Sequence, residues 1–362
     1  MTDLDDKTER LVRVARDHAV GGILVVSQPG FAWLTDGRSN GIDGSRENGS
    51  GALFVRADGR RYVIANTIEM PRLAGEELAG EDWEPLEYAW VEDHARPEIV
   101  AHLAAQTVDM GTRIGADWPL AGARLIDKPV SAARALLTPS EAARYRKLGA
   151  DAGRAMGEIA RGLEPGMSEH DVARRITDGA AALGGRATVV LVAADQRIAR
   201  FRHPVPTSAV WRSAVMLVAC IQRQGLVVAL SRVVSAGAPD EDLTRRTEAC
   251  AGVFRQLLEA TRPGATGSDL FSAAVRAYAD TGFAGEEQRH HQGGAIGYRS
   301  REWIAHPASE EVVQARQAFA WNPSITGTKV EDTALLTENG IEIITATADW
   351  QTIDGASGIL PV

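Results

Sequence analysis

A duplicated pattern in the second half of the chain restricts the possible fold more than any other feature of the sequence. Residues 164–166 (Glu-Pro-Gly) are followed by Ser168, and residues 262–264 (Arg-Pro-Gly) are followed by Thr266. In each copy a helix ends at Pro-Gly, a capping residue follows, and a new amphipathic helix leads on to strands. Pro-Gly after a helix is common, but two such units roughly one hundred residues apart favour a domain of two α-α-β halves.

The start of this domain is marked by residues 138–141 (Thr-Pro-Ser-Glu), a capping box with proline at the first helical position. A helix is therefore predicted from there to about Leu163. Ahead of it the pattern predicts helices over residues 8–19, 70–78 and 97–105. Short apolar runs bounded by Gly, Asn and Asp predict strands over residues 22–27, 31–34, 52–55 and 61–65. We expect an N-terminal α/β domain over residues 1–130 and a second domain over residues 138–362.

Composition narrows the classes of function. The formal net charge is −9, from 39 basic and 48 acidic residues without a long block of one sign, which argues against nucleic-acid binding. A small polar substrate in an internal pocket fits this balance. Cys220 and Cys250 are too few for a disulfide framework and fit a reducing compartment. The acidic N-terminus and the strand-length apolar runs predict a cytoplasmic protein with no signal peptide and no membrane partner.

Four segments place charged or imidazole side chains beside apolar strands, at residues 200–207, 225–232, 289–302 and 321–333. In order and spacing they resemble the catalytic domain shared by creatinase, prolidase, aminopeptidase P and methionine aminopeptidase. The resemblance implies an α+β fold. Its C-terminal pita-bread domain would have duplicated α-α-β halves around a curved antiparallel sheet, after an N-terminal creatinase-like α/β domain. It also implies a homodimer that acts on a small-molecule substrate.

The metal-dependent members of that family bind their metal through five side chains. Aligned on Gly225 and Arg232, those five positions correspond here to Val218, Ala229, Gly294, Asn322 and Glu331. Three of them have no donor side chain, one has a neutral amide, and only Glu331 keeps a carboxylate. A single carboxylate cannot offset the dehydration of a divalent ion. We therefore predict no metal at the family position and no cofactor.

The pattern is closest to creatinase, the family precedent for metal-independent hydrolysis of a C–N bond. Residues 203–206 (His-Pro-Val-Pro) are similar to the family's His-x-x-Pro loop, and His290 begins a His-x-x-Gly run like that of creatinase. Arg301 and Glu302 stand at the spacing of its Arg-Glu pair. The resemblance implies that His203 is the acid/base histidine and that His290 is also catalytic. Ser231 replaces a pocket glutamate of creatinase, which argues against creatine as the substrate.

The histidines also have plainer interpretations. Without the resemblance, His203 would be a solvated loop histidine, whereas the motif favours a proton-transfer role. His290 and His291 are adjacent and on a strand would point to opposite faces, so we expect only His290 to face the pocket. A metal site made of His290, His291 and His306 has no supporting spacing.

Glu331 lies in a predicted strand over residues 328–336, where it either pairs with an arginine such as Arg232 or positions a water or a cationic substrate. The arginines of these segments could pair with neighbouring carboxylates or bind a substrate carboxylate bidentately. Arg38 could help to close the pocket of a partner subunit, while Tyr298 and Trp321 fit the core or a pocket wall better than a specific role. The candidate substrate-binding residues are Arg232, Arg301, Glu302, Asn322, His291, Tyr298, Trp321 and Arg38.

These residues lead to three hypotheses of function. The main one is a metal-independent hydrolase that cleaves the C–N bond of a carboxylate-bearing amide, amidine or guanidino compound. His203 would protonate the leaving nitrogen and assist an attacking water, which Glu331 would orient. The first alternative is a non-catalytic binding module, like the pita-bread domains of the large FACT histone-chaperone subunit. The second is a metallo-aminopeptidase or prolidase-type peptidase. The same histidine could also serve a lyase or an isomerase.

Overall fold

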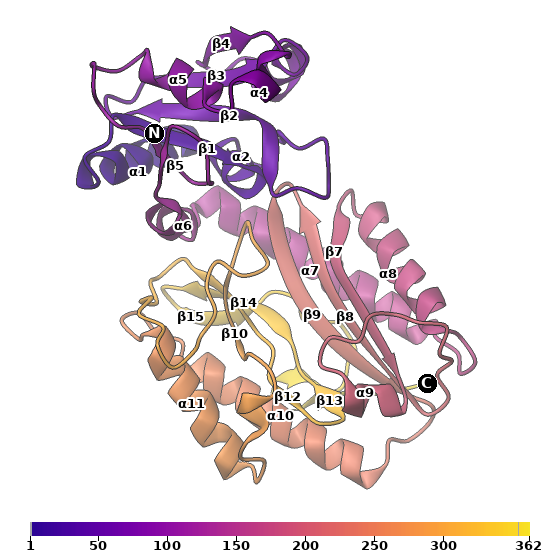
Figure 1. The fold of residues 1–362 in the computed structure, drawn as a ribbon. Helices are drawn as coiled ribbons and strands as arrows, with labels where there is room; N and C mark the ends of the chain where they lie inside the picture. The colour runs from indigo at the N-terminus through magenta and orange to yellow at the C-terminus, as the bar shows by residue number, and fades with distance from the viewer. Residues whose placement is uncertain (1, 354) are drawn as a thin grey trace. The chain divides into compact units, whose positions relative to one another are not determined.

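The chain divides into two compact units, Met1–Ala135 and Leu136–Val362. The computed structural model, drawn in Figure 1, describes residues 2–353 and 355–362. The boundary between the units falls within the short segment that separates the two predicted domains. In the part of the chain that the structure describes, no helix is both long and apolar enough to cross a membrane.

The first unit contains a mixed sheet with the strand order β4-β3-β2-β1-β5-β6. Its central pairs, β1 with β2 and β2 with β3, are antiparallel, and the outer pairs are parallel. Leu24, Phe54 and Ile64 from the three central strands are fully buried in its core. The strands are β1 Gly22–Ser27, β2 Asn48–Arg56, β3 Arg61–Asn66, β4 Glu84–Tyr88, β5 Gly115–Ala116 and β6 Arg124–Leu125. The helices are α1 Asp3–Asp17, α2 Gln28–Leu34, α3 Met70–Arg72, the π-turn η1 Leu73–Glu77, α4 Glu92–Ala95, α5 Ile99–Ala105 and α6 Asp127–Arg134.

One predicted strand of this unit is wrong. Residues 31–34 belong to helix α2, because the Ser27 side chain accepts a hydrogen bond from the Gly30 amide and Pro29 stands in the first turn. The run is too short for its apolar character to distinguish a strand from a buried helix. The other three predicted strands are confirmed as parts of β1, β2 and β3. Helix α1 begins earlier than predicted, at a capping box on Thr2.

The second unit begins as predicted, with Thr138 capping helix α7 through a complete capping box with Glu141. Two further helices of this unit start at the duplicated motifs, where Ser168 caps α8 and Thr266 caps α11, again through capping boxes. Gly166 and Gly264 occupy equivalent turns, with φ of 107° and 92°, values that favour glycine. The sequence echo is therefore a repeat of local structure. The helices are α7 Pro139–Arg161, α8 Glu169–Ala182, α9 Gln196–Arg200, α10 Glu241–Ala260, α11 Gly267–Asp280 and the 3₁₀ turn η2 Glu286–Gln288.

Each half of the second unit contributes a sheet. The first has the order β18-β9-β8-β7 and the second the order β10-β11-β14-β15, and nearly all pairs are antiparallel. Helices α7 and α8 pack beside the first sheet, and α10 and α11 pack together beside the second (Figure 1). A bridge between Ser231 and Glu331 joins the two halves. The strands are β7 Arg186–Ala194, β8 Ala214–Arg223, β9 Leu226–Ser235, β10 Gly293–Ile296, β11 Ala318–Trp321, β12 Ser324–Ile325, β13 Thr328–Lys329, β14 Asp332–Thr337, β15 Gly340–Ile343, β16 Thr352–Ile353, β17 Ala356–Ser357 and β18 Ile359–Pro361.

Candidate active site

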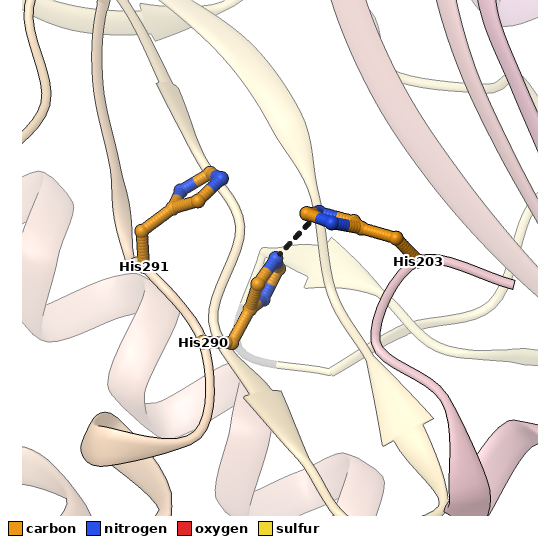
Figure 2. A group of neighbouring side chains, drawn as sticks. All are labelled: His203, His290 and His291. Carbon is orange, nitrogen blue, oxygen red and sulfur yellow. Dashed lines mark hydrogen bonds between the residues drawn. The ribbon is translucent and has the colours of Figure 1, made fainter.

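Two loops of the second unit bring three histidines together. His203 lies in the loop after α9, and His290 and His291 lie between η2 and β10. One ring nitrogen from each histidine lies within 4.8 Å of the others. Figure 2 shows the three rings facing a common space, with Nε2 of His203 and Nε2 of His290 3.2 Å apart in a hydrogen bond. The two histidines singled out in the sequence therefore meet, one from each half of the repeat.

An ion pair, between a residue next to His203 and a residue of η2, joins the two histidine loops. Arg202, which precedes His203, pairs with Glu286 in η2 and donates a hydrogen bond to Thr326 Oγ1 at 3.0 Å. The Thr326 amide in turn donates to Glu286 Oε2 at 3.0 Å. Since Glu286 lies four residues before His290, this network fixes the approach of the two loops. The partners of Arg202 are more than eighty residues away in sequence, so no local pattern indicates them.

The adjacent histidines differ in their surroundings. His290 is buried, with Nδ1 3.1 Å from Ser324 Oγ and its carbonyl accepting a hydrogen bond from Gln292 at 2.6 Å. Within the described residues, the ring of His291 makes no hydrogen bond, and its Nδ1 is buried without a partner. The prediction that the two rings point to opposite faces is wrong. They lie in a bend before β10 rather than on a strand, and both rings approach His203.

A largely buried charge cluster lies around the segment between β13 and β14. The Glu331 carboxylate is 2.8 Å from the Lys329 ammonium and 3.1 Å from Arg301 Nη2, and it accepts a hydrogen bond from Ser231 Oγ at 2.7 Å. Burial by itself would raise the pKa of Glu331, but the two cations outweigh it and hold the pKa at about 2. Glu331 is thus ion-paired, with Arg301 and Lys329 as its partners rather than Arg232.

Lys329 is a site residue that sequence reasoning missed. It is buried, and its charge contributes to the lowered pKa values of all three histidines. A signal for it was present, because Lys329 and Glu331 are two residues apart in an extended segment, and alternate residues share a face. The predicted continuous strand over residues 328–336 is in fact interrupted between β13 and β14, and Glu331 lies at this interruption.

The histidines are neutral at neutral pH. Burial lowers the pKa of His290 to about 2, and the Lys329 charge adds to this effect. Burial and the nearby Arg301 lower the pKa of His291 to about 4. His203 is exposed as a residue, yet partial burial of its ring and the Lys329 charge also lower its pKa. Each ring therefore keeps one unprotonated nitrogen that can accept a proton or bind a metal.

These shifts predict acid sensitivity of the metal-free protein. Because the folded-state pKa values of His290 and His291 lie below the ordinary 6.5, the unfolded chain binds more protons as the pH falls through this range. The contribution of these two histidines to the free energy of unfolding is therefore fully present above pH 6.5. Below pH 6.5 the free energy of unfolding declines by about 1.4 kcal/mol per pH unit for each of them. In urea unfolding between about pH 4.5 and 6, His290→Gln should flatten this decline. A parent-like slope in the variant would contradict the prediction.

Arg232 is structural rather than a substrate-binding residue. It is buried and pairs with Asp332 at 3.0 Å. Its guanidinium also donates to the Thr347 hydroxyl at 3.0 Å and to the Thr345 carbonyl at 2.8 Å. It donates a further bond, of 2.7 Å, to the Ser231 carbonyl. These contacts occupy the guanidinium fork that was predicted to bind a substrate carboxylate.

Arg232→Lys tests this assignment. Lysine keeps the charge but cannot reproduce a planar fork, so the free energy of unfolding should fall by roughly 1–3 kcal/mol. The KM for any substrate should stay unchanged, because the side chain does not reach it. Thermal unfolding and steady-state kinetics of the same preparation measure both quantities. A variant with parent stability and a raised KM would restore Arg232 to the substrate site.

The remaining predicted site residues have the following contacts. Trp321 is in the hydrophobic core, where its indole N–H donates to Thr261 Oγ1 at 3.0 Å. Tyr298 is buried, and its hydroxyl donates to Glu141 on α7 at 2.7 Å. Both therefore have the contacts of structural residues, and neither supports the predicted substrate-binding role.

Glu302 and Arg38 also have partners of their own. The Glu302 carboxylate accepts backbone hydrogen bonds from Tyr298 and Arg299, each of 3.2 Å. Arg38 belongs to the first unit, where it lies 3.5 Å from Glu81. Its contribution to a partner subunit's pocket, like the homodimer itself, stays a prediction.

The residues at the five family metal positions do not fit a metal. Glu331 already has an ammonium and a guanidinium as counter-ions. Asn322 is buried, and its Oδ1 lacks a hydrogen-bond partner within the described residues, so it offers one neutral oxygen. A Cβ at Gly294 would lie 2.1 Å from the backbone oxygen of Trp303, so no histidine can replace it without a backbone shift. One paired carboxylate and one amide cannot hold the ion.

Comparison with known proteins adds four findings. A model of the metallopeptidase family M24 matches residues 143–338. The Xaa-Pro dipeptidase of Pyrococcus horikoshii is 28% identical over 124 residues, which are 33% of this chain and 35% of that protein. The probable dipeptidase PepE of Mycobacterium tuberculosis is 28% identical over 204 residues, 54% of each chain. The chain thus spans about half the length of these relatives or less. The crystal structure of dipeptidase PepE from Mycobacterium ulcerans has a TM-score of 0.80 and 19% identity, covering 99% of this chain and 98% of that one.

The structural match confirms the predicted fold class, an N-terminal domain followed by a domain with antiparallel sheets in duplicated halves. The predicted closeness to creatinase has no support, since these relatives are dipeptidases. Of the three functional hypotheses, the second alternative, a metallo-aminopeptidase or prolidase-type peptidase, fits the comparisons better than the metal-independent hydrolase of amides, amidines or guanidino compounds.

Proposed function

The chain belongs to the metallopeptidase family M24, and we propose that it hydrolyses short peptides without a metal at the family position. The dipeptidase names of its relatives support a peptide, which is an amide, over the amidine and guanidino compounds of the main hypothesis. The misfit of the five family positions supports a mechanism that uses the chain's own acid, base and cationic groups. Within the family this makes the chain a hydrolase of C–N bonds with a rearranged site.

One observation carries the proposal: an exposed, neutral histidine lies beside a buried cluster of two cations and one anion. His203 is accessible and has a lowered pKa, so its free nitrogen can accept a proton at neutral pH. Its ring is fixed by the 3.2 Å contact with His290. Lys329 and Arg301 lie close enough to His203 to influence its pKa. A general base, His203, and two cations that can stabilise negative charge, Lys329 and Arg301, therefore lie close together.

The proposed reaction uses these groups in sequence. A water adds to the peptide carbonyl carbon while His203 accepts its proton. The oxygen that becomes negative is stabilised by the positive charge of Arg301 and Lys329. The C–N bond then breaks, and His203 returns the proton to the leaving nitrogen, so that an acid and an amine are formed. Nη1 of Arg301 already donates to the Ser300 carbonyl and Nη2 donates to Glu331, so Arg301 supports the reaction by its charge and not by the predicted bidentate contact with a substrate carboxylate.

Glu331 has a different role from the one first predicted. Its pKa of about 2 makes it a very weak base, and its oxygens are occupied by Lys329, Arg301 and Ser231. We therefore assign it the role of a positioning residue that holds the two cations in place. His290 supports His203 in the same way, because its own pKa of about 2 makes it a poor proton acceptor.

A substrate panel tests the proposal. Chelator-treated protein is incubated with dipeptides, including Xaa-Pro dipeptides, and with carboxylated amidines and guanidino acids. We expect turnover of at least one dipeptide and none of the other compounds. Turnover of an amidine or guanidino acid alone would return the function to the original hypothesis. Peptide turnover that requires an added metal would contradict the metal-free mechanism.

The non-catalytic binding module remains as a second candidate, because four of the five family metal positions have lost their charged or imidazole ligands. A module that only binds should hold a dipeptide with unchanged affinity after His203→Gln, and it should release no amine over long incubation. Calorimetric titration with a dipeptide, followed by amine analysis of the same sample, separates binding from hydrolysis.

A further inference from the structure

We propose that His203, His290 and His291 form a binding site for one transition-metal ion of the zinc class, built from residues other than the five family positions. The site takes one donor from the first half of the repeat and two from the second. Three imidazoles with a fourth position left open are a common donor set for a catalytic zinc ion.

The spacing of the ring nitrogens supports this site. Two nitrogens on one tetrahedral zinc ion, each at 2.0–2.1 Å, lie roughly 3.3 Å apart. Nε2 of His203 and Nε2 of His290 are already 3.2 Å apart. All three ligand nitrogens lie within 4.8 Å of one another, so closing the cluster requires a side-chain movement of at most roughly 1.5 Å. As Figure 2 shows, the rings face one another, so this movement needs no reversal of a side chain.

The surroundings of the rings fit metal ligands. A histidine that binds a metal through one nitrogen usually donates the other N–H to an oxygen nearby. For His290, with Nε2 toward the cluster, Ser324 Oγ lies 3.1 Å from Nδ1 and can accept that bond. The ring of His291 has no hydrogen bond to any described residue, so its free nitrogen can bind an ion without breaking one. His203 is exposed and provides the route of entry.

Charge decides the class of ion. Lys329 and Arg301 lie near the rings and oppose a cation, while Glu331 offsets only part of their charge. An ion that depends on charged oxygen ligands, such as Mg²⁺, Ca²⁺ or Mn²⁺, gains too little here. Ions with a strong preference for imidazole, namely Zn²⁺, Cu²⁺, Ni²⁺ and Co²⁺, can overcome this repulsion. We therefore expect a site that binds zinc-class ions and rejects the harder cations.

The site has a consequence that rests on the proposed function. The nitrogen of His203 that faces the cluster cannot hold an ion and accept a proton at the same time. The metal-bound and metal-free forms of the protein are therefore chemically different at one residue. Binding of the ion is measured without substrate, so a failure of the hydrolase proposal leaves this inference standing, and the reverse also holds.

The test is a titration of chelator-stripped full-length protein with Co²⁺. We expect one ion per chain, visible absorption typical of low-coordinate Co²⁺, and displacement by Zn²⁺ but not by Mn²⁺. His203→Ala and His291→Ala should each weaken binding by at least about tenfold. His203 is exposed, so its variant tests the site even if a change at the buried rings disturbs folding.

His306→Ala is the matched control, because it removes an exposed histidine of the same unit that lies outside the cluster. It should bind Co²⁺ like the parent. The inference is overturned if the parent binds no Co²⁺, or if binding by the His203 and His291 variants matches that of the parent. Equal loss of binding in the His306 variant would also overturn it, since that result indicates non-specific binding by exposed imidazoles.

Discussion

Replacing His203 by glutamine should lower kcat by about 10²–10⁴-fold on whichever peptide the protein cleaves. Glutamine retains a polar group of similar reach but cannot take up a proton from water. The hydrogen-bonded neighbour His290 cannot replace it, because burial lowers the pKa of that ring to about 2. KM should change little, since the substrate is held by the cationic groups. The measurement is steady-state kinetics on metal-free protein.

The control for this experiment is His170→Gln, which changes an exposed histidine on α8 outside the cluster. Its kcat should equal that of the parent. Circular dichroism of both variants shows whether the fold is intact. If His203→Gln keeps the parent kcat, the acid–base role is wrong, whatever the substrate is.

Replacing Glu331 by glutamine should destabilise the second unit by about 3–5 kcal/mol. The substitution leaves the Lys329 ammonium, 4% exposed, and the Arg301 guanidinium, 14% exposed, without their common counter-ion. A buried charge that loses its partner retains the full cost of desolvation. For a unit of this size the midpoint of thermal unfolding should fall by roughly 6–20 °C.

Two comparisons separate charge from shape. Asp242→Asn removes the ion pairs that the exposed Asp242 carboxylate forms with Arg245 and Arg246, and should cost at most about 1 kcal/mol. The double variant Lys329→Met with Glu331→Gln should be more stable than Glu331→Gln alone, because one of the two unpaired cations is gone. If the double variant is less stable than the single one, the destabilisation comes from packing and not from charge.

Local signals predicted the fold where the sequence and the backbone have a direct physical link. The capping box at Thr138 and the motifs at Ser168 and Thr266 predicted the starts of three helices, because a side-chain oxygen and an amide three residues away pair only in that geometry. The helix over residues 28–34 was missed although Ser27 provided its cap. Its four apolar residues fit a buried strand equally well.

The site was only partly predictable, because its charges depend on residues that are distant in sequence. The family resemblance brought out His203, His290 and Glu331. It could not show that His291 turns toward the same space, since this depends on a bend rather than on a strand. Nor could it show that Arg232 is enclosed by the Asp332 carboxylate and backbone carbonyls, since these partners come from other strands and loops.

The carbonyl of Trp303, 2.1 Å from where a side chain at Gly294 would begin, makes the departure from the family site difficult to reverse. Single substitutions could place carboxylates at positions 218 and 229, but each would bury an acid beside residues that do not complete a metal site. A histidine at position 294 would first require the segment around residue 303 to move. A designer who wants the metal site of the family in this chain must therefore rebuild backbone and ligands together.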